Sequence, residues 1–137
     1  KDSEKRLWLW KSGLEVFREN LWFGVGTGDI EQELQKKYKK YALKEAQEHN
    51  YNVHNQYLDI AIKLGLFGLA IFLFWIFYTL YISIKDRQFR FFYFMLIMSI
   101  NFFFEVMLNS IAGVSFFAFF YALLYSIYNR RTSILLD

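Results

Sequence analysis

The sequence predicts an all-α membrane protein fragment, in which an outward-facing helical segment precedes three transmembrane helices. Two observations lead to this prediction: 55% of the 137 residues are hydrophobic, and the charges are unevenly distributed. Residues 1–63 hold 11 of the 16 basic and 10 of the 13 acidic side chains. A soluble domain would spread its charges over the whole chain, because charged side chains cover its surface. The absence of Cys and Pro and the high hydrophobicity also exclude a disulfide scaffold, collagen and a disordered chain.

Three apolar runs have the length of membrane-spanning helices. Residues 66–84 and 111–128 contain no charged side chain, and residues 91–108 contain only Glu105. A helix needs about 20 apolar residues to cross the bilayer, where it satisfies its own backbone hydrogen bonds. Helices buried in a soluble core are the alternative, but they would leave so small a protein with almost no polar surface. We therefore predict an outward segment at residues 1–65, three spans within residues 66–131 and a cytoplasmic tail at residues 132–137.

The orientation of the spans follows from the basic residues in the short connections. Residues 85–90 carry three basic side chains and residues 129–131 carry two, whereas the connection at residues 109–110 carries none. Short cytoplasmic connections are enriched in Lys and Arg. The 85–90 turn and the C-terminus are therefore expected in the cytoplasm, and residues 1–65 on the outer face.

The outward segment contains two predicted amphipathic helices, at residues 4–21 and 30–48. Arg6 shares an edge of the first apolar stripe with Trp10, so it either reaches solvent and lipid headgroups or lies along a buried surface. The second helix has a lysine-rich face, which is either simply solvated or attracts anionic lipid or a phosphorylated substrate. Nucleic acid is not an expected partner, because this face points outward and glutamates nearly balance its charge.

Two short polar stretches follow these helices and could bind a ligand. The first lies between the two helices, where Gly24, Gly26 and Gly28 occupy every second position. This pattern allows positive φ and close approach to an anion, but it is also typical of a tight turn. Further on, His54 and Asn55 lie at the start of the helix that leads to the first span, where Asn52 is the expected cap. Histidine exchanges protons near neutral pH, yet a hydrogen-bonded structural histidine is the alternative.

Glu105 is the one charged residue inside a predicted span. We expect it about one helical turn before the outer end of the second span, on the same side of the membrane as His54. An ionisable group within a span is a candidate functional residue. So close to the boundary, however, it could simply reach water.

Several motifs in this order resemble the C-terminal part of the O-antigen ligase and polymerase superfamily. They read RLWLW at residues 6–10, WFGVGTGD at 22–29, HNQYLD at 54–59 and LGLFGL at 64–69. The resemblance covers most of the chain and implies a bacterial inner-membrane glycosyltransferase with a large periplasmic loop. Trp22 replaces a proline that is usual before the glycine turn, and no counterpart of an upstream family arginine is identifiable. The chain is therefore expected to be part of a larger enzyme.

The resemblance implies transfer of a glycan from an undecaprenyl pyrophosphate carrier to a hydroxyl acceptor, without a metal or other cofactor. His54 matches the histidine that acts on the acceptor hydroxyl, and Arg6 matches the arginine that holds the donor pyrophosphate. Asn55 and the glycine turn would help to bind the substrates, and Glu105 would support them.

Lipid A core is the acceptor if the protein is an O-antigen ligase, which we consider the leading interpretation. An O-antigen polymerase or a protein O-glycosyltransferase of the same superfamily is the alternative within this chemistry. A non-catalytic membrane subunit of a polysaccharide exporter is the alternative outside it.

Overall fold

The computed structural model describes the backbone of residues 2–134 and the side chains of residues 4–129. The helices are α1 (Asp2–Glu19), α2 (Ile30–Lys40), α3 (Lys44–Glu48), α4 (Gln56–Lys85), α5 (Phe89–Asn101), the short 3-10 helix η1 (Met107–Asn109) and α6 (Ile111–Ile134). The described residues contain no strand, so the all-α prediction is confirmed. Of the cytoplasmic tail expected at residues 132–137, residues 135–137 lie outside the described residues.

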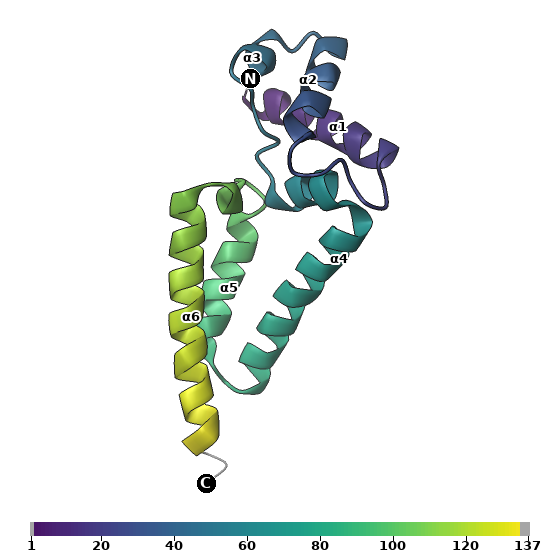
Figure 1. The fold of residues 1–137 in the computed structure, drawn as a ribbon. Coiled ribbons are helices and arrows are strands. Elements are labelled where there is room, and N and C mark those ends of the chain that lie inside the picture. Colours follow the sequence, from purple (N-terminus) through teal and green to yellow (C-terminus); the bar gives the residue numbers. More distant parts are fainter. Residues whose placement is uncertain (1, 135–137) are drawn as a thin grey trace.

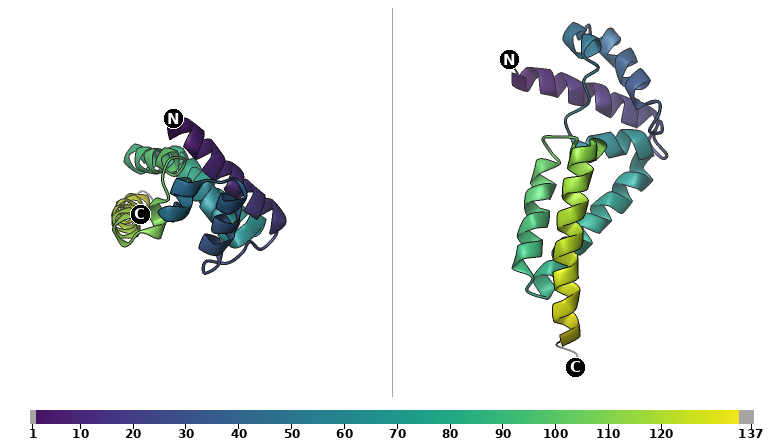
Figure 2. Two further views of the ribbon diagram at one scale, coloured as in Figure 1. Left: turned by 90° about the horizontal axis from the view of Figure 1, so that it is seen from above. Right: turned by 60° about the vertical axis from the view of Figure 1, so that its left-hand side comes forward.

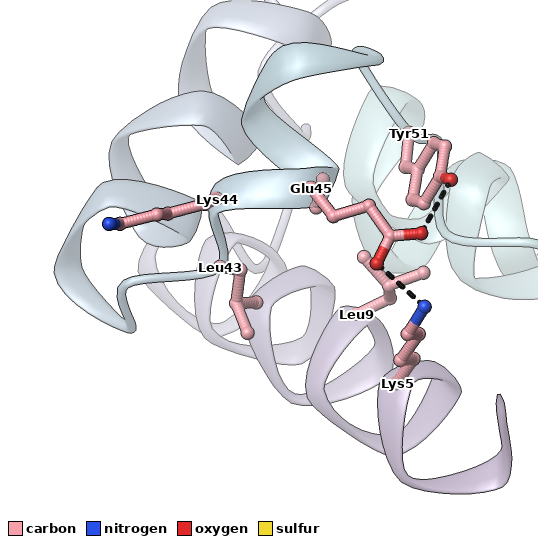
Figure 3. Close-up of a pocket in the computed structure, with 7 residues that line it drawn as sticks. Lys5, Leu9, Leu43, Lys44, Glu45 and Tyr51 are labelled. Atoms are coloured by element: carbon pink, nitrogen blue, oxygen red, sulfur yellow. Dashed lines mark hydrogen bonds and ion pairs between the residues drawn. The ribbon is translucent and has the colours of Figure 1, made fainter. Parts of the chain in front are cut away.

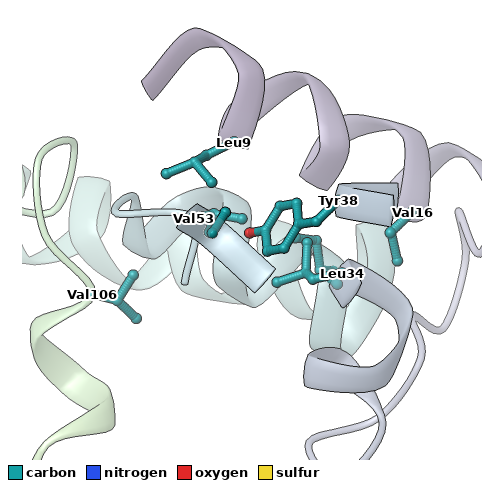
Figure 4. Close-up of a cluster of buried hydrophobic side chains, with 8 residues drawn as sticks. Leu9, Val16, Leu34, Tyr38, Val53 and Val106 are labelled. Atoms are coloured by element: carbon teal, nitrogen blue, oxygen red, sulfur yellow. The ribbon is translucent and has the colours of Figure 1, made fainter. Parts of the chain in front are cut away.

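The helices form two layers (Figure 1). A head made of α1, α2, α3 and the start of α4 lies at one end, and the rest of α4, α5 and α6 extend away from it. The head has its own core of eight buried side chains, most of which are labelled in Figure 4: Leu9, Val16, Leu34, Tyr38, Ala46, Val53, Ile62 and Val106. Val106 reaches this core from the connection between α5 and α6, so the two layers are packed together.

The second predicted helix, at residues 30–48, is broken into α2 and α3. Ala42 has a positive φ of 52°, which no regular helix continues through. The carbonyl of Tyr38 accepts hydrogen bonds from the amide of Leu43 at 2.9 Å and from the side chain of Gln47 at 3.1 Å. The break turns α3 back over the head and buries Ala46 in its core.

α4 begins at Gln56 rather than after Asn52, and the capping residue is Asn55. Its side-chain oxygen accepts the amide of Leu58 at 2.9 Å, which satisfies one of the free N–H groups at the helix start. The expected cap, Asn52, instead accepts the amide of His54 at 2.8 Å. The polar stretch before α4 is therefore a short ordered loop and not the first turn of the helix.

A sharp bend at Gly65 divides α4 into a part under the head and a long apolar part (Figure 1). Gly65 has φ 67° and ψ −164°, a conformation that is essentially restricted to glycine. The bend leaves backbone groups of α4 unpaired, and the turn after α1 pairs with them. Val25 and Gly26 donate to the carbonyls of Ile62 and Lys63, each at 2.9 Å, and Leu66 donates to Leu21 at 2.8 Å.

Two of the three predicted spans have the length and hydropathy of membrane-crossing helices. They are α4 (Gln56–Lys85) and residues Ile111–Asn129 of α6. Only 22% and 6% of their most apolar stretches are buried within the chain, which favours contact with lipid over the core of a soluble protein. Their side chains pack on α5 through a second cluster that contains Ile76, Phe91, Met95, Met98, Phe102 and Phe117. α5 and α6 lie side by side (Figure 2).

The expected helix at residues 91–108 is shorter than the sequence suggests, because α5 ends at Asn101. Its 13 residues correspond to about 20 Å, less than the hydrocarbon thickness of about 30 Å. The carbonyl of Phe102 accepts the backbone N–H of Gln56 at 2.8 Å, and the chain leaves the helix there. A third span therefore stays a prediction, and Glu105 lies in a loop instead of one turn inside a helix.

Candidate functional site

Arg6, His54 and Glu105 come from three separate parts of the chain and meet at the junction of the two layers. Glu105 is central: its Oε2 lies 3.4 Å from Nδ1 of His54, and its Oε1 lies 4.0 Å from Nη2 of Arg6. All three side chains are accessible, with 43% of Arg6, 32% of His54 and 54% of Glu105 exposed. A basic side chain, an imidazole and a carboxylate thus share one accessible surface.

The loop before α4 holds His54 rigidly. Its φ is 45°, an uncommon value for a residue other than glycine, and its amide donates to Asn52. Val53 is completely buried in the head core, and the ring of Tyr51 packs edge-on against the imidazole at 6.2 Å. Strained backbone held by its surroundings is frequent at functional sites.

Asn55 is 8% exposed, and its side-chain oxygen is used as the cap of α4. It therefore positions His54 through the backbone, since the two are neighbours. A direct contact between Asn55 and a substrate stays a prediction.

The ion pair between Arg6 and Glu105 is weak. Its length of 4.0 Å is at the limit for an ion pair, and both partners are about half exposed. Exposed pairs of this kind contribute roughly 0–1 kcal/mol, so little energy is lost when Arg6 turns to another anion. By contrast, lysines of α2 are engaged: Lys37 contacts Glu15 and Glu19, and Lys40 contacts Glu15.

The glycine turn is remote from this surface. It follows Glu19, and the distance from Arg6 to Glu19 along α1 is about 20 Å. The amides of Val25 and Gly26 are already donated to α4, while Gly26 and Gly28 face open space. Substrate binding by Gly24, Gly26 and Gly28 stays a prediction, and their described contacts are structural.

A small pocket adjoins the site between α1 and α3 (Figure 3). It has a volume of about 220 Å³, and Leu9 lies against its apolar floor. At its rim, Glu45 pairs with Lys5 at 2.6 Å and accepts the Tyr51 hydroxyl at 3.2 Å. The hydrogen bond from Lys5 lowers the pKa of Glu45, so this carboxylate stays ionised to a lower pH than an isolated glutamate. Tyr51 connects the pocket to His54.

Two buried polar residues beneath the site were not predicted from the sequence. Gln56 and Asp59 are each 2% exposed, and both hydrogen-bond to the connection that carries Glu105. The sequence did contain a signal for them, because two polar residues three positions apart lie on the otherwise apolar face of a helix that leads into a span. Such residues are buried only when hydrogen-bonded.

Comparison with known proteins gives one match. A family model described as O-antigen ligase matches residues 1–73, more than half of the chain, a range that contains Arg6 and His54 but not Glu105. No curated protein and no solved structure matches the chain.

Proposed function

This chain belongs to the O-antigen ligase family, and from that premise we propose that it transfers O-antigen from undecaprenyl pyrophosphate to the lipid A core. Family membership indicates an enzyme of the ligase or polymerase type, and the apolar helices indicate a membrane protein. The proposal adds the donor, the acceptor and the location, which is the periplasmic face of the bacterial inner membrane. One observation carries it: Arg6 and His54, far apart in sequence, both lie against Glu105.

His54 is the general base of the proposed reaction. Its Nε2 accepts the proton of the acceptor hydroxyl while that oxygen bonds to the anomeric carbon of the glycan. The bond from this carbon to the pyrophosphate oxygen breaks, and the electron pair leaves with the pyrophosphate. The contact of Nδ1 with Glu105 supports this role, because the tautomer with its proton on Nδ1 leaves Nε2 as the acceptor.

Arg6 binds the pyrophosphate of the donor. Its planar guanidinium can donate two parallel hydrogen bonds to phosphate oxygens and stabilise the charge that develops on the leaving group. The long pair with Glu105 supports this role, since the guanidinium is accessible and can turn to a phosphate. Glu105 then orients His54 and balances the charge of the imidazolium that forms.

A general base contributes about 10²–10⁴-fold to a rate, which sets the expected effect of His54→Ala. We expect the full-length variant, expressed in cells that lack the native gene, to leave the lipid A core without O-antigen while lipid-linked O-antigen accumulates. His49→Ala is the matched control, because His49 is also an exposed histidine that stacks on Tyr51. The control should retain the ladder of O-antigen bands on a lipopolysaccharide gel.

The same gel separates the competing functions. Loss of the native gene that leaves one repeat unit on the core would indicate a polymerase, and changes confined to glycoproteins would indicate a protein glycosyltransferase. Transfer at the wild-type rate by His54→Ala would contradict the proposed base. A membrane subunit without catalytic activity would show no transfer by the purified full-length protein.

Arg6→Ala should raise the KM for lipid-linked O-antigen, because the donor loses its phosphate ligand, and Arg6→Lys should restore binding in part. Arg18→Ala provides the control, since Arg18 is an exposed arginine of the same helix. An unchanged KM and kcat for Arg6→Ala would remove Arg6 from the site.

A further inference from the structure

The connection that carries Glu105 is fixed to the head on both sides of this residue. Phe102 is fully buried in the cluster between the long helices, and Val106 is buried in the head core. Glu105 itself is exposed between them. The carboxylate therefore projects from a short segment whose two neighbouring anchors lie in different cores.

Gln56 ties both ends of this segment to the start of α4. Its backbone N–H donates to the carbonyl of Phe102 at 2.8 Å, and its side-chain Oε1 accepts the N–H of Leu108 at 2.7 Å. Gln56 is 2% exposed, so neither bond competes with water. Gln56 follows His54 by two residues, so the same residue lies close to the imidazole in the chain and is hydrogen-bonded to the segment that carries the carboxylate.

Asp59 adds a second tie one turn further along α4. Its carboxylate accepts Nδ2 of Asn109 at 3.2 Å and pairs with Lys63 at 2.7 Å. Asn109 is the last residue of η1, immediately after the residue that Gln56 holds. The hydrogen bonds of Gln56 and Asp59 therefore hold two neighbouring residues of the connection, Leu108 and Asn109, against the start of α4.

We infer that Gln56 is a positioning residue, which holds Glu105 at the distance where its carboxylate orients His54; this inference rests on the proposed function. The distances of 3.4 and 4.0 Å from Glu105 to His54 and Arg6 are already at the long end for such contacts. A small displacement of the connection would break both. Displacements of about 1 Å at reacting groups can cost about 100-fold in rate.

The test compares two substitutions of Gln56 in the full-length enzyme, with lipid-linked O-antigen and core lipid A extracted from cells that lack the gene. Gln56→Met keeps the size of the side chain but offers the N–H of Leu108 only a weak thioether acceptor, whereas Gln56→Glu keeps an acceptor oxygen. We expect Gln56→Met to lower kcat by about 10- to 100-fold with little change in the donor KM. Gln56→Glu should restore most of the rate. Thr79→Val is the control, since this buried hydroxyl bonds only within α4 among the described contacts.

A double substitution distinguishes positioning from a general effect on folding. If Gln56 acts through Glu105, adding Gln56→Met to Glu105→Ala should lower kcat no further. An equal loss in both backgrounds, or a wild-type kcat for Gln56→Met alone, would overturn the inference. If Gln56→Met does not accumulate in the membrane, Gln56→Asn is the second variant, because its polar side chain is one carbon too short to reach the N–H of Leu108, and it should show the same dependence on Glu105.

The inference and the proposed function can fail separately. Full activity of His54→Ala would contradict the proposed function. Inactive His54→Ala together with fully active Gln56→Met would contradict only the role of Gln56.

Discussion

Gly65→Ala should strongly destabilise the protein, because the bend of α4 leaves no space for a methyl group beside the turn after α1. Gly65 has φ 67° and ψ −164°, and a Cβ built on it would lie 2.3 Å from the carbonyl oxygen of Trp22 and 2.5 Å from the amide nitrogen of Phe23. These neighbours are backbone atoms, which cannot rotate away as the end of a flexible side chain can. Alanine at this position therefore forces the turn and α4 apart.

The expected loss has two parts. A residue other than glycine in this region of φ and ψ costs about 1–3 kcal/mol. Separation of the turn from α4 also breaks three backbone hydrogen bonds, those of Val25 to Ile62, Gly26 to Lys63 and Leu66 to Leu21. Each contributes about 1 kcal/mol, so the total loss is about 4 to 6 kcal/mol.

Two neighbouring glycines provide graded controls. Gly26 has φ 86° but a Cβ there would meet no atom within 4 Å, so Gly26→Ala carries only backbone strain, about 1–2 kcal/mol. Gly28 has neither a positive φ nor a close neighbour. Gly28→Ala should change stability by less than about 0.5 kcal/mol.

The free energy of unfolding can be measured on the purified full-length protein by titration with SDS in mixed micelles. The expected order of destabilisation is Gly65→Ala, then Gly26→Ala, then Gly28→Ala. Equal stability of the Gly65 and Gly28 variants would refute the argument that the close backbone contact at the bend holds the turn after α1 against α4.

Two further predictions concern charge. Hydrogen bonds from Lys40 and Tyr41 lower the pKa of Glu15 from 4.5 to about 2, so its stabilising contribution is complete above about pH 4.5 and is lost as the pH falls toward 2. Glu15→Gln should therefore be less stable than wild type at pH 7 and should lose less stability on acidification, measured as the melting temperature against pH. For topology, in full-length protein without other cysteines, Ser110→Cys should react with a membrane-impermeant maleimide in intact spheroplasts and Arg87→Cys only after permeabilisation. The reverse pattern would contradict the proposed orientation.

Sequence patterns found the components of the site but not their arrangement. The motifs around Arg6 and His54 were sufficient to predict both as candidates, because each motif is a local pattern. Glu105 was recognised as unusual only from its place in an apolar run, and its expected position inside a helix was wrong. The helix ends early because the carbonyl of Phe102 is bonded to Gln56, a partner 46 residues away that no local pattern reveals.

The length and charge of the apolar runs were sufficient to predict an all-helical protein with helices long and apolar enough to cross a membrane, because hydropathy and helical periodicity are local properties of the chain. The break at Ala42 and the choice of Asn55 as the cap required the tertiary structure. Each depends on which backbone groups find a partner from another segment. The same holds for the site: composition supplied a guanidinium, an imidazole and a carboxylate, and only packing of the head against the α5–α6 connection brought them within reach of one another.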